Sequence, residues 1–340
     1  MQQRLQTNPG EFSFFRTLDH GRSHVLRRSL QWPWLAQIYR NSAHRTLLLF
    51  MVSLTVNSFI LVRWPFVAFW IAPLLFGIPH LFTSFRYSQP GTHPPRQAIA
   101  FVLLTTIAAG VGFACSTTMA LSVGLMMSVL WLAYSQNSIR PSVITGLGIL
   151  LTAIYFIPRE TSLVLLIGHN FLAFLLWNRK AKTREQRKTV FFSFALMVVA
   201  IGLLILYAPF VPEGITESLF SGQSSPFLNK MVILFLVSQS AHYFIWLKAI
   251  PDYASSSATP GGFAFTFVQY QKIFSVPTLV GALIIGALLW LTVFLENLDS
   301  ARTLYLGIAT FHGLFEIMAL LSPHSPVLFS RPIRKAYGLL

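Results

Sequence analysis

Four histidines lie inside long apolar stretches of this 340-residue chain. They are His80 in LLFGIPHLF, His169 in LLIGHNFLAF, His242 in SQSAHYFIWL and His312 in IATFHGLFEIMAL. Imidazole is costly to place in hydrocarbon, so an ionisable residue within a membrane segment marks a candidate functional site. Glu316 follows His312 by four positions, which brings both side chains to one face of a helix. The pattern predicts a ligand set gathered from separate helices.

Imidazole nitrogens are ligands for iron, copper, zinc and nickel. A low-dielectric site favours neutral imidazole, the form that binds a metal. Glu316 is expected to ligate the metal, to orient His312 or to accept a proton. Four further polar residues are candidates for contact with the substrate or for hydrogen bonds to the ligands: Gln239, Tyr243, Asn170 and Tyr134.

The composition indicates a membrane protein, because 54% of the residues are hydrophobic, only 10% are charged and the mean hydropathy is +0.62. Apolar segments of about 17–25 residues, the length that crosses a bilayer core, recur along the chain. We therefore expect an all-α, polytopic bundle of about ten transmembrane helices. The expected spans are 46–62, 64–83, 97–115, 117–136, 141–157, 160–178, 189–210, 228–249, 275–295 and 301–322.

These spans divide the chain into three parts: a basic N-terminal segment (1–45), the transmembrane bundle (46–322) and a basic C-terminal tail (323–340). Trp32 and Trp34 favour an interfacial amphipathic helix in the first part, with an ordinary basic tail as the alternative. The longest inner connection, 252–274, combines small residues with aromatic ones, which would suit a lid or substrate gate.

The net charge of +15 comes from basic residues scattered over short loops and both ends of the chain. With the N-terminus in the cytoplasm, nearly all Lys and Arg fall on the inner side and most acids on the outer side. This distribution predicts a multi-pass integral protein with both termini cytoplasmic, in a bacterial inner membrane. It argues against a nucleic-acid partner.

The four buried histidines belong to the second, sixth, eighth and tenth expected spans, which all run from outside to inside. At 1.5 Å per residue, their depths from the outer end are roughly 24, 14, 21 and 17 Å in chain order. Histidines placed independently need not share a layer. The common depth therefore predicts that the four side chains meet near the middle of the membrane.

Several familiar sites are missing from the sequence. It has no HxxxH or HxxHH box of the membrane desaturases, no P-loop, no GxSxG and no CxxC. No lysine lies in the middle of an expected span, which argues against a retinal Schiff base. The single cysteine, Cys115, excludes an intrachain disulfide.

The segment Gly77-Ile78-Pro79-His80 resembles the GxPH element of the bacterial Brp/Blh family of β-carotene 15,15'-dioxygenases. The resemblance implies a membrane-embedded non-haem iron oxygenase that cleaves a carotenoid to retinal, with His80 as an iron ligand. On the same analogy His169, His242 and His312 are ligands by role only. The family's element continues with Gly and then Asp, whereas this chain continues with Leu81-Phe82-Thr83-Ser84.

We therefore predict an integral-membrane oxygenase in which histidines hold non-haem iron and which acts with molecular oxygen on a lipophilic, carotenoid-like substrate drawn from the membrane lipids. Copper and zinc are alternative metals, and zinc would suit an intramembrane hydrolase. A haem protein for electron transfer would use pairs of the same histidines as axial ligands. A transporter or lipid-binding protein would use the histidines and Glu316 as a proton relay.

Overall fold

The computed structural model describes residues 13–88, 95–114, 116–135, 141–207, 225–254, 274, 276–294 and 298–321. These residues are almost all helical and contain no strand, which confirms the all-α class. The α-helices are α1 (Ser13–Ser29), α2 (Pro33–Arg40), α3 (Ser42–Arg63), α4 (Ala72–Ser88), α5 (Pro95–Ala114), α6 (Thr117–Ser135), α7 (Pro141–Phe156), α8 (Pro158–Lys180), α9 (Arg184–Tyr207), α11 (Pro226–Phe244), α12 (Ile250–Ala254), α14 (Val276–Phe294) and α15 (Leu298–Leu321). Two π-helical turns, η1 (Val67–Ile71) and η2 (Ile245–Ala249), precede α4 and join α11 to α12.

Five of the described helical stretches are long and apolar enough to cross a membrane, as expected for a membrane protein. They are Ser42–Arg63, Thr117–Tyr134, Glu160–Lys180, Arg184–Tyr207 and Pro226–Ala254. Three shorter apolar helical stretches are Arg96–Val111, Ile144–Phe156 and Thr303–Met318. Each of the ten expected spans overlaps a described helix. The number of spans and the side of the termini stay predictions.

Local signals fix where several helices begin. The side chain of Asn41 caps α3 by accepting hydrogen bonds from the backbone N–H groups of Ala43 (2.9 Å) and His44 (3.4 Å). Ser225 caps α11 in the same way, through the N–H of Leu228 (3.2 Å), and Pro226 follows at the first helical position. Between such caps the backbone satisfies its own hydrogen bonds, which is the condition for lying in hydrocarbon.

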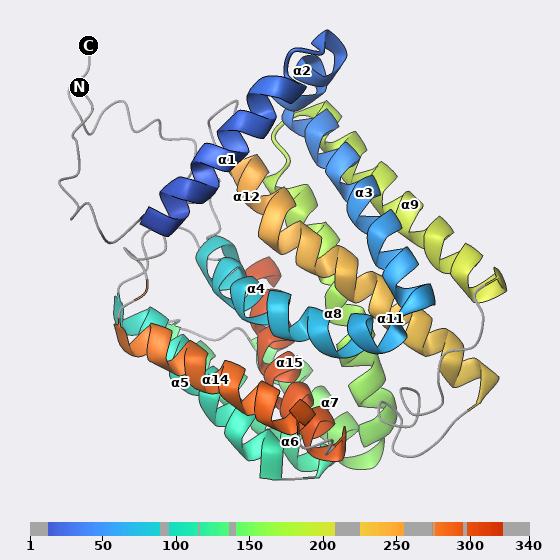
Figure 1. Cartoon of the computed structure of the whole chain (residues 1–340). Helices are drawn as coiled ribbons and strands as arrows, with labels where there is room; N and C mark the ends of the chain where they lie inside the picture. Colours follow the sequence, from blue (N-terminus) through green and yellow to red (C-terminus); the bar gives the residue numbers. More distant parts are fainter. Residues whose placement is uncertain are drawn as a thin grey trace.

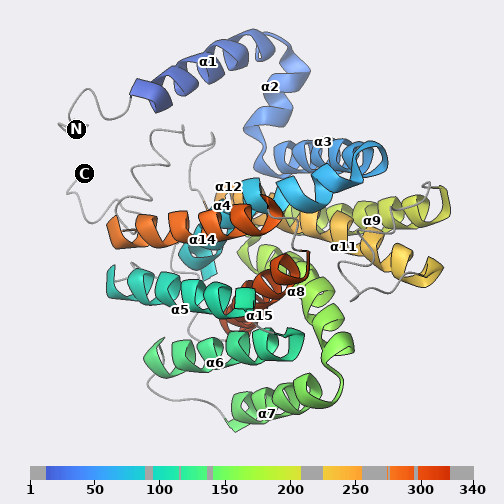
Figure 2. The same cartoon turned by 60° about the horizontal axis from the view of Figure 1, so that its bottom comes forward.

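The helices form two groups around a central helix. Figure 1 shows α3 and α9 side by side along one edge, with α5, α6 and α14 gathered at the opposite edge. In Figure 2 the helices α14, α5, α6 and α7 are stacked in that order. Helix α15 lies within the bundle and contacts α4, α5, α6, α8 and α14. It is therefore the element that other helices hold in place.

Small residues let α15 approach its neighbours closely. A Cβ atom on Gly124 of α6 would lie 2.6 Å from Thr310 Cβ and 2.8 Å from the backbone oxygen of Gly307, so only glycine fits there. Gly307 in turn faces the backbone carbonyl of Ala108 on α5. Close backbone packing through small residues is typical of membrane helices. These contacts fix the position of α15 within about one and a half turns before His312.

Apolar packing completes the frame on both sides. Phe85, Phe101, Trp131 and Phe315 stack into one buried aromatic cluster that joins α4, α5, α6 and α15. The outer faces carry large exposed apolar side chains, for example Leu206, which is 74% exposed. Exposed apolar faces around a packed interior are expected for helices surrounded by lipid.

A buried ion pair ties α3 to α12. Arg45 Nε lies 3.0 Å from Asp252 Oδ2, and both side chains are almost completely buried. Thr46 donates its hydroxyl to the same carboxylate oxygen (3.3 Å), and Lys248 Nζ lies 3.6 Å from the other oxygen. The carboxylate of Asp252 thus has partners from two helical segments at the end of the bundle near α2.

The structure describes parts of the predicted N-terminal segment and of the predicted transmembrane bundle. Within the 1–45 segment, α1 and α2 form two helices outside the bundle (Figure 2), and Trp32 and Trp34 are 61% and 56% exposed. The bundle begins at Ser42, a few residues before the expected boundary. The 323–340 tail, Cys115 and residues 255–273 of the expected gate lie outside the described residues.

Candidate metal centre

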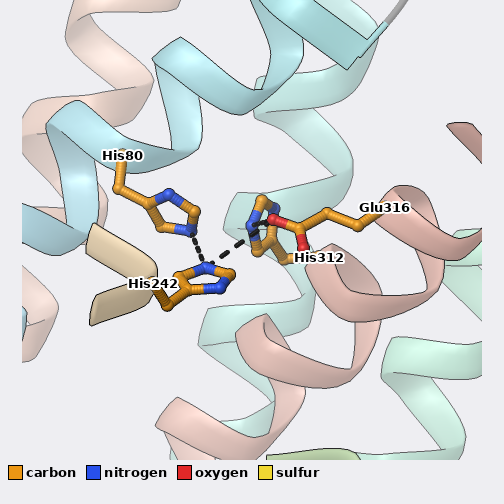
Figure 3. A group of neighbouring side chains, drawn as sticks. All are labelled: His80, His242, His312 and Glu316. Carbon is orange, nitrogen blue, oxygen red and sulfur yellow. Dashed lines mark hydrogen bonds and ion pairs between the residues drawn. The ribbon is translucent and has the colours of Figure 1, made fainter. Parts of the chain in front are cut away.

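Three of the four predicted histidines meet in the interior together with the predicted carboxylate. His80 comes from α4, His242 from α11, and His312 and Glu316 from α15. One nitrogen or oxygen atom from each of the four side chains lies within 4.8 Å of all the others. Figure 3 shows the side chains pointing toward a common centre from three helices. We call these four residues the histidine–glutamate cluster.

The separations in the histidine–glutamate cluster fit ligands of one ion. His242 Nε2 lies 3.0 Å from His80 Nε2, and Glu316 Oε1 lies 2.7 Å from His312 Nε2. Glu316 Oε1 is also 3.7 Å from His242 Nε2. Metal bonds to imidazole nitrogen and carboxylate oxygen are about 2.0–2.2 Å long, so two ligands of one ion stand about 3–4 Å apart. The observed distances lie in or close to that range.

The hydrogen bonding of the cluster is incomplete. Glu316 is fully buried, and neither of its carboxylate oxygens has a well-formed hydrogen bond from a described residue, although the indole N–H of Trp246 lies within reach of the carboxylate. The close approach of His312 Nε2 lacks the alignment of a hydrogen bond, and that nitrogen is also without a partner within the described chain. Buried polar atoms of this kind cost about 1–3 kcal/mol each. A bound cation would satisfy all three atoms at once.

The backbone departs from a regular α-helix beside two of the ligands. Directly after His242, the N–H of Ile245 is shared between the carbonyls of Ala241 and His242, and the π-helical turn η2 begins. On α4, Pro79 lies inside the helix next to His80. Single π-helical turns within α-helices occur frequently at functional sites, because they rotate the side chains that follow.

Ser84 supports the ring of His312. It lies one turn after His80 on α4, and its hydroxyl is 3.4 Å from His312 Nδ1. A hydrogen bond at Nδ1 orients the imidazole so that Nε2 faces the cluster. Ser84 was not among the residues predicted from the sequence. Its signal was the four-residue spacing from His80, which places both side chains on one helix face.

The fourth predicted ligand, His169, lies beside the histidine–glutamate cluster. Its ring centroid is 4.9 Å from that of His242 and 6.5 Å from that of His312. Among the described residues, the set whose ligand atoms converge does not include it. His169 Nδ1 is 2.9 Å from the backbone oxygen of Leu165. Because a carbonyl only accepts, Nδ1 donates, and His169 Nε2 is left as an acceptor.

A small cavity of about 40 Å³ opens next to the cluster, and His80, His169 and His312 form part of its wall. Two predicted polar residues, Gln239 and Tyr243, line the same cavity. Tyr305, which the sequence analysis missed, also lines it and donates its hydroxyl to Gln239 Oε1 (3.2 Å). The cavity has room for about one or two small molecules of the size of water.

The other two predicted polar residues have different surroundings. Asn170 donates from Nδ2 to Ser238 Oγ (3.0 Å), a bond that joins α8 to α11. Tyr134 is 51% exposed on α6 and packs against Trp131, away from the cluster. Asn170 thus makes a contact between helices, and Tyr134 is not brought to the site.

Comparisons of the chain with protein-family models, with curated proteins and with solved structures gave no match. They neither support nor contradict the resemblance to the Brp/Blh family, which stays a prediction. Function is therefore inferred from the geometry of the histidine–glutamate cluster.

Proposed function

We propose that this protein is a membrane-embedded metalloenzyme, an oxygenase that holds non-haem iron at His80, His242, His312 and Glu316 and acts on a lipophilic substrate. The observation that carries the proposal is the convergence of these four buried donors within 4.8 Å. Each of these groups is costly to desolvate, and a bound cation that satisfies all four would offset that cost.

The donor set supports the choice of metal. Three nitrogens and one carboxylate oxygen suit iron, zinc and copper in their divalent states, and the cluster contains no thiolate. Histidine and carboxylate ligands with open positions are typical of non-haem iron oxygenases. When bound, iron would supply the activation of oxygen that the protein's own side chains cannot perform. The 40 Å³ cavity beside the cluster is large enough to hold a molecule of oxygen.

The chain's own residues would bind the metal, orient its ligands and shield the site from water. Ser84 holds His312 through Nδ1, so that the other ring nitrogen faces the centre. The apolar side chains of Ile78, Leu81 and Ile308 line the cavity and limit the access of water. Glu316 carries a second carboxylate oxygen, which could accept a proton or complete the ligand set.

The geometry argues against the haem alternative. Axial ligands of a haem lie on opposite faces of a wide flat ring. Here the facing nitrogens of His80 and His242 are 3.0 Å apart, which leaves no space for such a ring between them. A proton relay would use the same contacts between Glu316, His242 and His312 without a metal. Measurement of the metal content separates that alternative from ours.

A carotenoid-like substrate is what the Brp/Blh resemblance suggests. A carotenoid is far larger than the 40 Å³ cavity, so its binding would require side chains at the cavity wall to move. A lipophilic substrate entering sideways from the bilayer is consistent with a site inside the bundle.

The test has two parts, both on protein purified in detergent. Elemental analysis should find about one iron per chain, and His80→Ala, His242→Ala and His312→Ala should each lose most of it. His44→Ala, a change at an exposed histidine outside the cluster, is the matched control and should keep the metal. Protein returned to lipid vesicles and supplied with ¹⁸O₂ and a reductant should transfer the label to a lipid-soluble product.

Absence of any stoichiometric metal would contradict the metal centre and favour the proton relay. Zinc in place of iron, together with no transfer of ¹⁸O, would contradict the oxygenase and favour a hydrolase.

A further inference from the structure

Two helices that are long and apolar enough to cross a membrane begin side by side. They are α3, which begins at Ser42, and α9, which begins at Arg184. Gln186 Nε2, in the first turn of α9, donates to Ser42 Oγ (3.0 Å). Figure 1 shows the two helices running next to each other from this point. For helices that cross a bilayer, this places one membrane surface at the level of Ser42 and Arg184.

Basic residues from two distant parts of the sequence meet at this level. Asn41, directly after α2, donates from Nδ2 to Glu185 Oε2 (3.4 Å), so the connection from α8 to α9 lies beside the end of α2. Figure 1 shows α1 and α2 at the end of the bundle where α3 and α9 begin. We call the exposed basic residues of these segments the basic rim: Arg27, Arg28, Arg40, Arg179, Lys182, Arg184, Arg187 and Lys188.

Few acids offset this charge. Residues 13–40 and 179–188 contain five and six Lys or Arg, against one acid each. The acid of the first segment, Asp19, lies 3.7 Å from Arg22, and that of the second, Glu185, accepts from Asn41. A surface with this excess of positive charge attracts anions.

Apolar side chains accompany the basic rim. Leu18 and Val25 lie two turns apart on α1 and are both exposed. Trp32 and Trp34 follow the end of α1, and their exposed rings pack edge to face with centroids 6.3 Å apart. Indole rings favour the level of the lipid headgroups. A nucleic acid would contact the basic residues but leave these apolar side chains in water, whereas an anionic bilayer surface covers both.

Helix α2 is held against the bundle. Arg45 in α3 donates from Nη1 to the backbone oxygen of Tyr39, and its guanidinium carbon lies 5.3 Å from the centre of the Tyr39 ring. Asp252 holds Arg45 in turn through the buried ion pair. Trp34 and Arg40 belong to α2, so these contacts keep both residues near the level where α3 begins.

We propose that the basic rim, together with Leu18, Val25, Trp32 and Trp34, is a docking surface for anionic phospholipids, which hold α1 and α2 on one face of the bilayer. The positive side chains would bind the lipid phosphates, and the indole rings would lie among the headgroups. This surface is separate from the histidine–glutamate cluster, and its test does not involve a metal.

Native mass spectrometry measures the lipid preference of the full-length protein. The protein is released from nanodiscs made of equal amounts of phosphatidylglycerol and phosphatidylcholine, and the lipids that stay bound are counted. Phosphatidylglycerol should be retained at least about fivefold over phosphatidylcholine, because each Lys or Arg near an anionic surface strengthens binding by about that factor.

Two double variants test the two parts of the basic rim. Arg27→Gln with Arg28→Gln, and Arg187→Gln with Lys188→Gln, should each reduce the preference for phosphatidylglycerol several-fold. Arg63→Gln is the matched control, because Arg63 is exposed at the opposite end of α3 and should leave the preference unchanged.

A fluorescent bimane label tests whether the surface lies on the bilayer. The label is attached through Gln31→Cys, between α1 and α2, after Cys115→Ser has removed the single native cysteine. Brominated phosphatidylglycerol should quench it more than brominated phosphatidylcholine. The difference should shrink in 1 M salt, where the screening length falls from about 10 Å to about 3 Å.

Equal retention of the two lipids would overturn the inference, as would a preference that neither double variant reduces. A label at position 31 that neither brominated lipid quenches would also overturn it, because the segment would then lie in water. An equal loss of preference in Arg63→Gln would show that positive charge anywhere on the protein suffices, which contradicts a docking surface.

Discussion

Replacing Glu316 by leucine should affect stability less favourably with metal than without it. Glu316 is fully buried, and neither carboxylate oxygen has a well-formed hydrogen bond from a described residue. Without metal, the protein holds an unsatisfied buried carboxylate that Glu316→Leu removes. With metal, the same change removes a ligand. We therefore expect the stability difference between the two proteins to move in favour of the unaltered protein when metal is added.

The change in stability has two contributions, one from the buried carboxylate and one from the bound metal. A buried polar group without a hydrogen bond costs about 1–3 kcal/mol, so an apolar replacement of similar volume should stabilise the metal-free protein by about that much. Metal at one hundred times its dissociation constant adds about 2.7 kcal/mol to the unaltered protein. If loss of one ligand weakens binding about a hundredfold, the same metal concentration adds only about 0.4 kcal/mol to the variant. Metal should therefore shift the difference by about 2.3 kcal/mol.

Thermal unfolding in detergent, followed by tryptophan fluorescence, measures the effect. Each protein is scanned after chelation and again with an excess of iron under anaerobic conditions. Gly148→Ala provides a control for substitution far from the cluster. A Glu316→Leu protein that is destabilised equally in both conditions would refute the reasoning, because it would show that the carboxylate is satisfied within the protein itself.

Two further predictions concern the frame that holds the cluster. Asp252→Asn should destabilise the protein by about 3–5 kcal/mol, because it leaves Arg45 buried without its carboxylate. Thermal unfolding of the chelated protein should show this loss. Unchanged stability would mean that the ion pair contributes nothing. Gly124→Ala should lower the yield of folded protein and its metal content, because the new Cβ would clash with Thr310 and the Gly307 carbonyl. Gly148→Ala is its matched control, and equal behaviour of the two variants in size-exclusion chromatography and metal analysis would contradict the packing of α15.

The helical fold could be predicted from the sequence because apolar length is a strong signal in membrane proteins. Each expected span overlaps a described helix, and the expected break at 178–189 corresponds to the gap between Lys180 and Arg184. The number of helices that cross the bilayer cannot be predicted from apolar length alone. Some described helices, such as α7, are shorter than the length that a span requires, and length alone does not say how a short helix lies.

The meeting of His80, His242 and His312 could also be predicted, because a shared depth needs only the rise per residue. The position of His169 beside the cluster could not be predicted in this way. Whether a side chain at the right depth also points to the centre depends on the rotation of its helix. The rise per residue does not give that rotation for α8, the helix that carries His169.

Tyr134 and Tyr305 also depend on the rotation of their helices, one as a wrong candidate and the other as a missed one. Tyr134 was one of the four further polar candidates, but it lies on the exposed face of α6. Tyr305 was overlooked although it precedes His312 by seven residues, a spacing of two turns that puts both on one face of α15. Extending the stripe that contains His312 and Glu316 by two turns would have found it.

X-ray absorption spectroscopy at the metal edge of the purified protein tests the central claim most directly. We predict one metal ion surrounded by nitrogen and oxygen at about 2.0–2.2 Å, with the scattering pattern of three imidazoles. The His242→Ala protein, where it still holds metal, should show one imidazole fewer, and His44→Ala should give the unaltered spectrum. A spectrum with porphyrin or sulfur ligands, or one that His242→Ala leaves unchanged, would contradict the account.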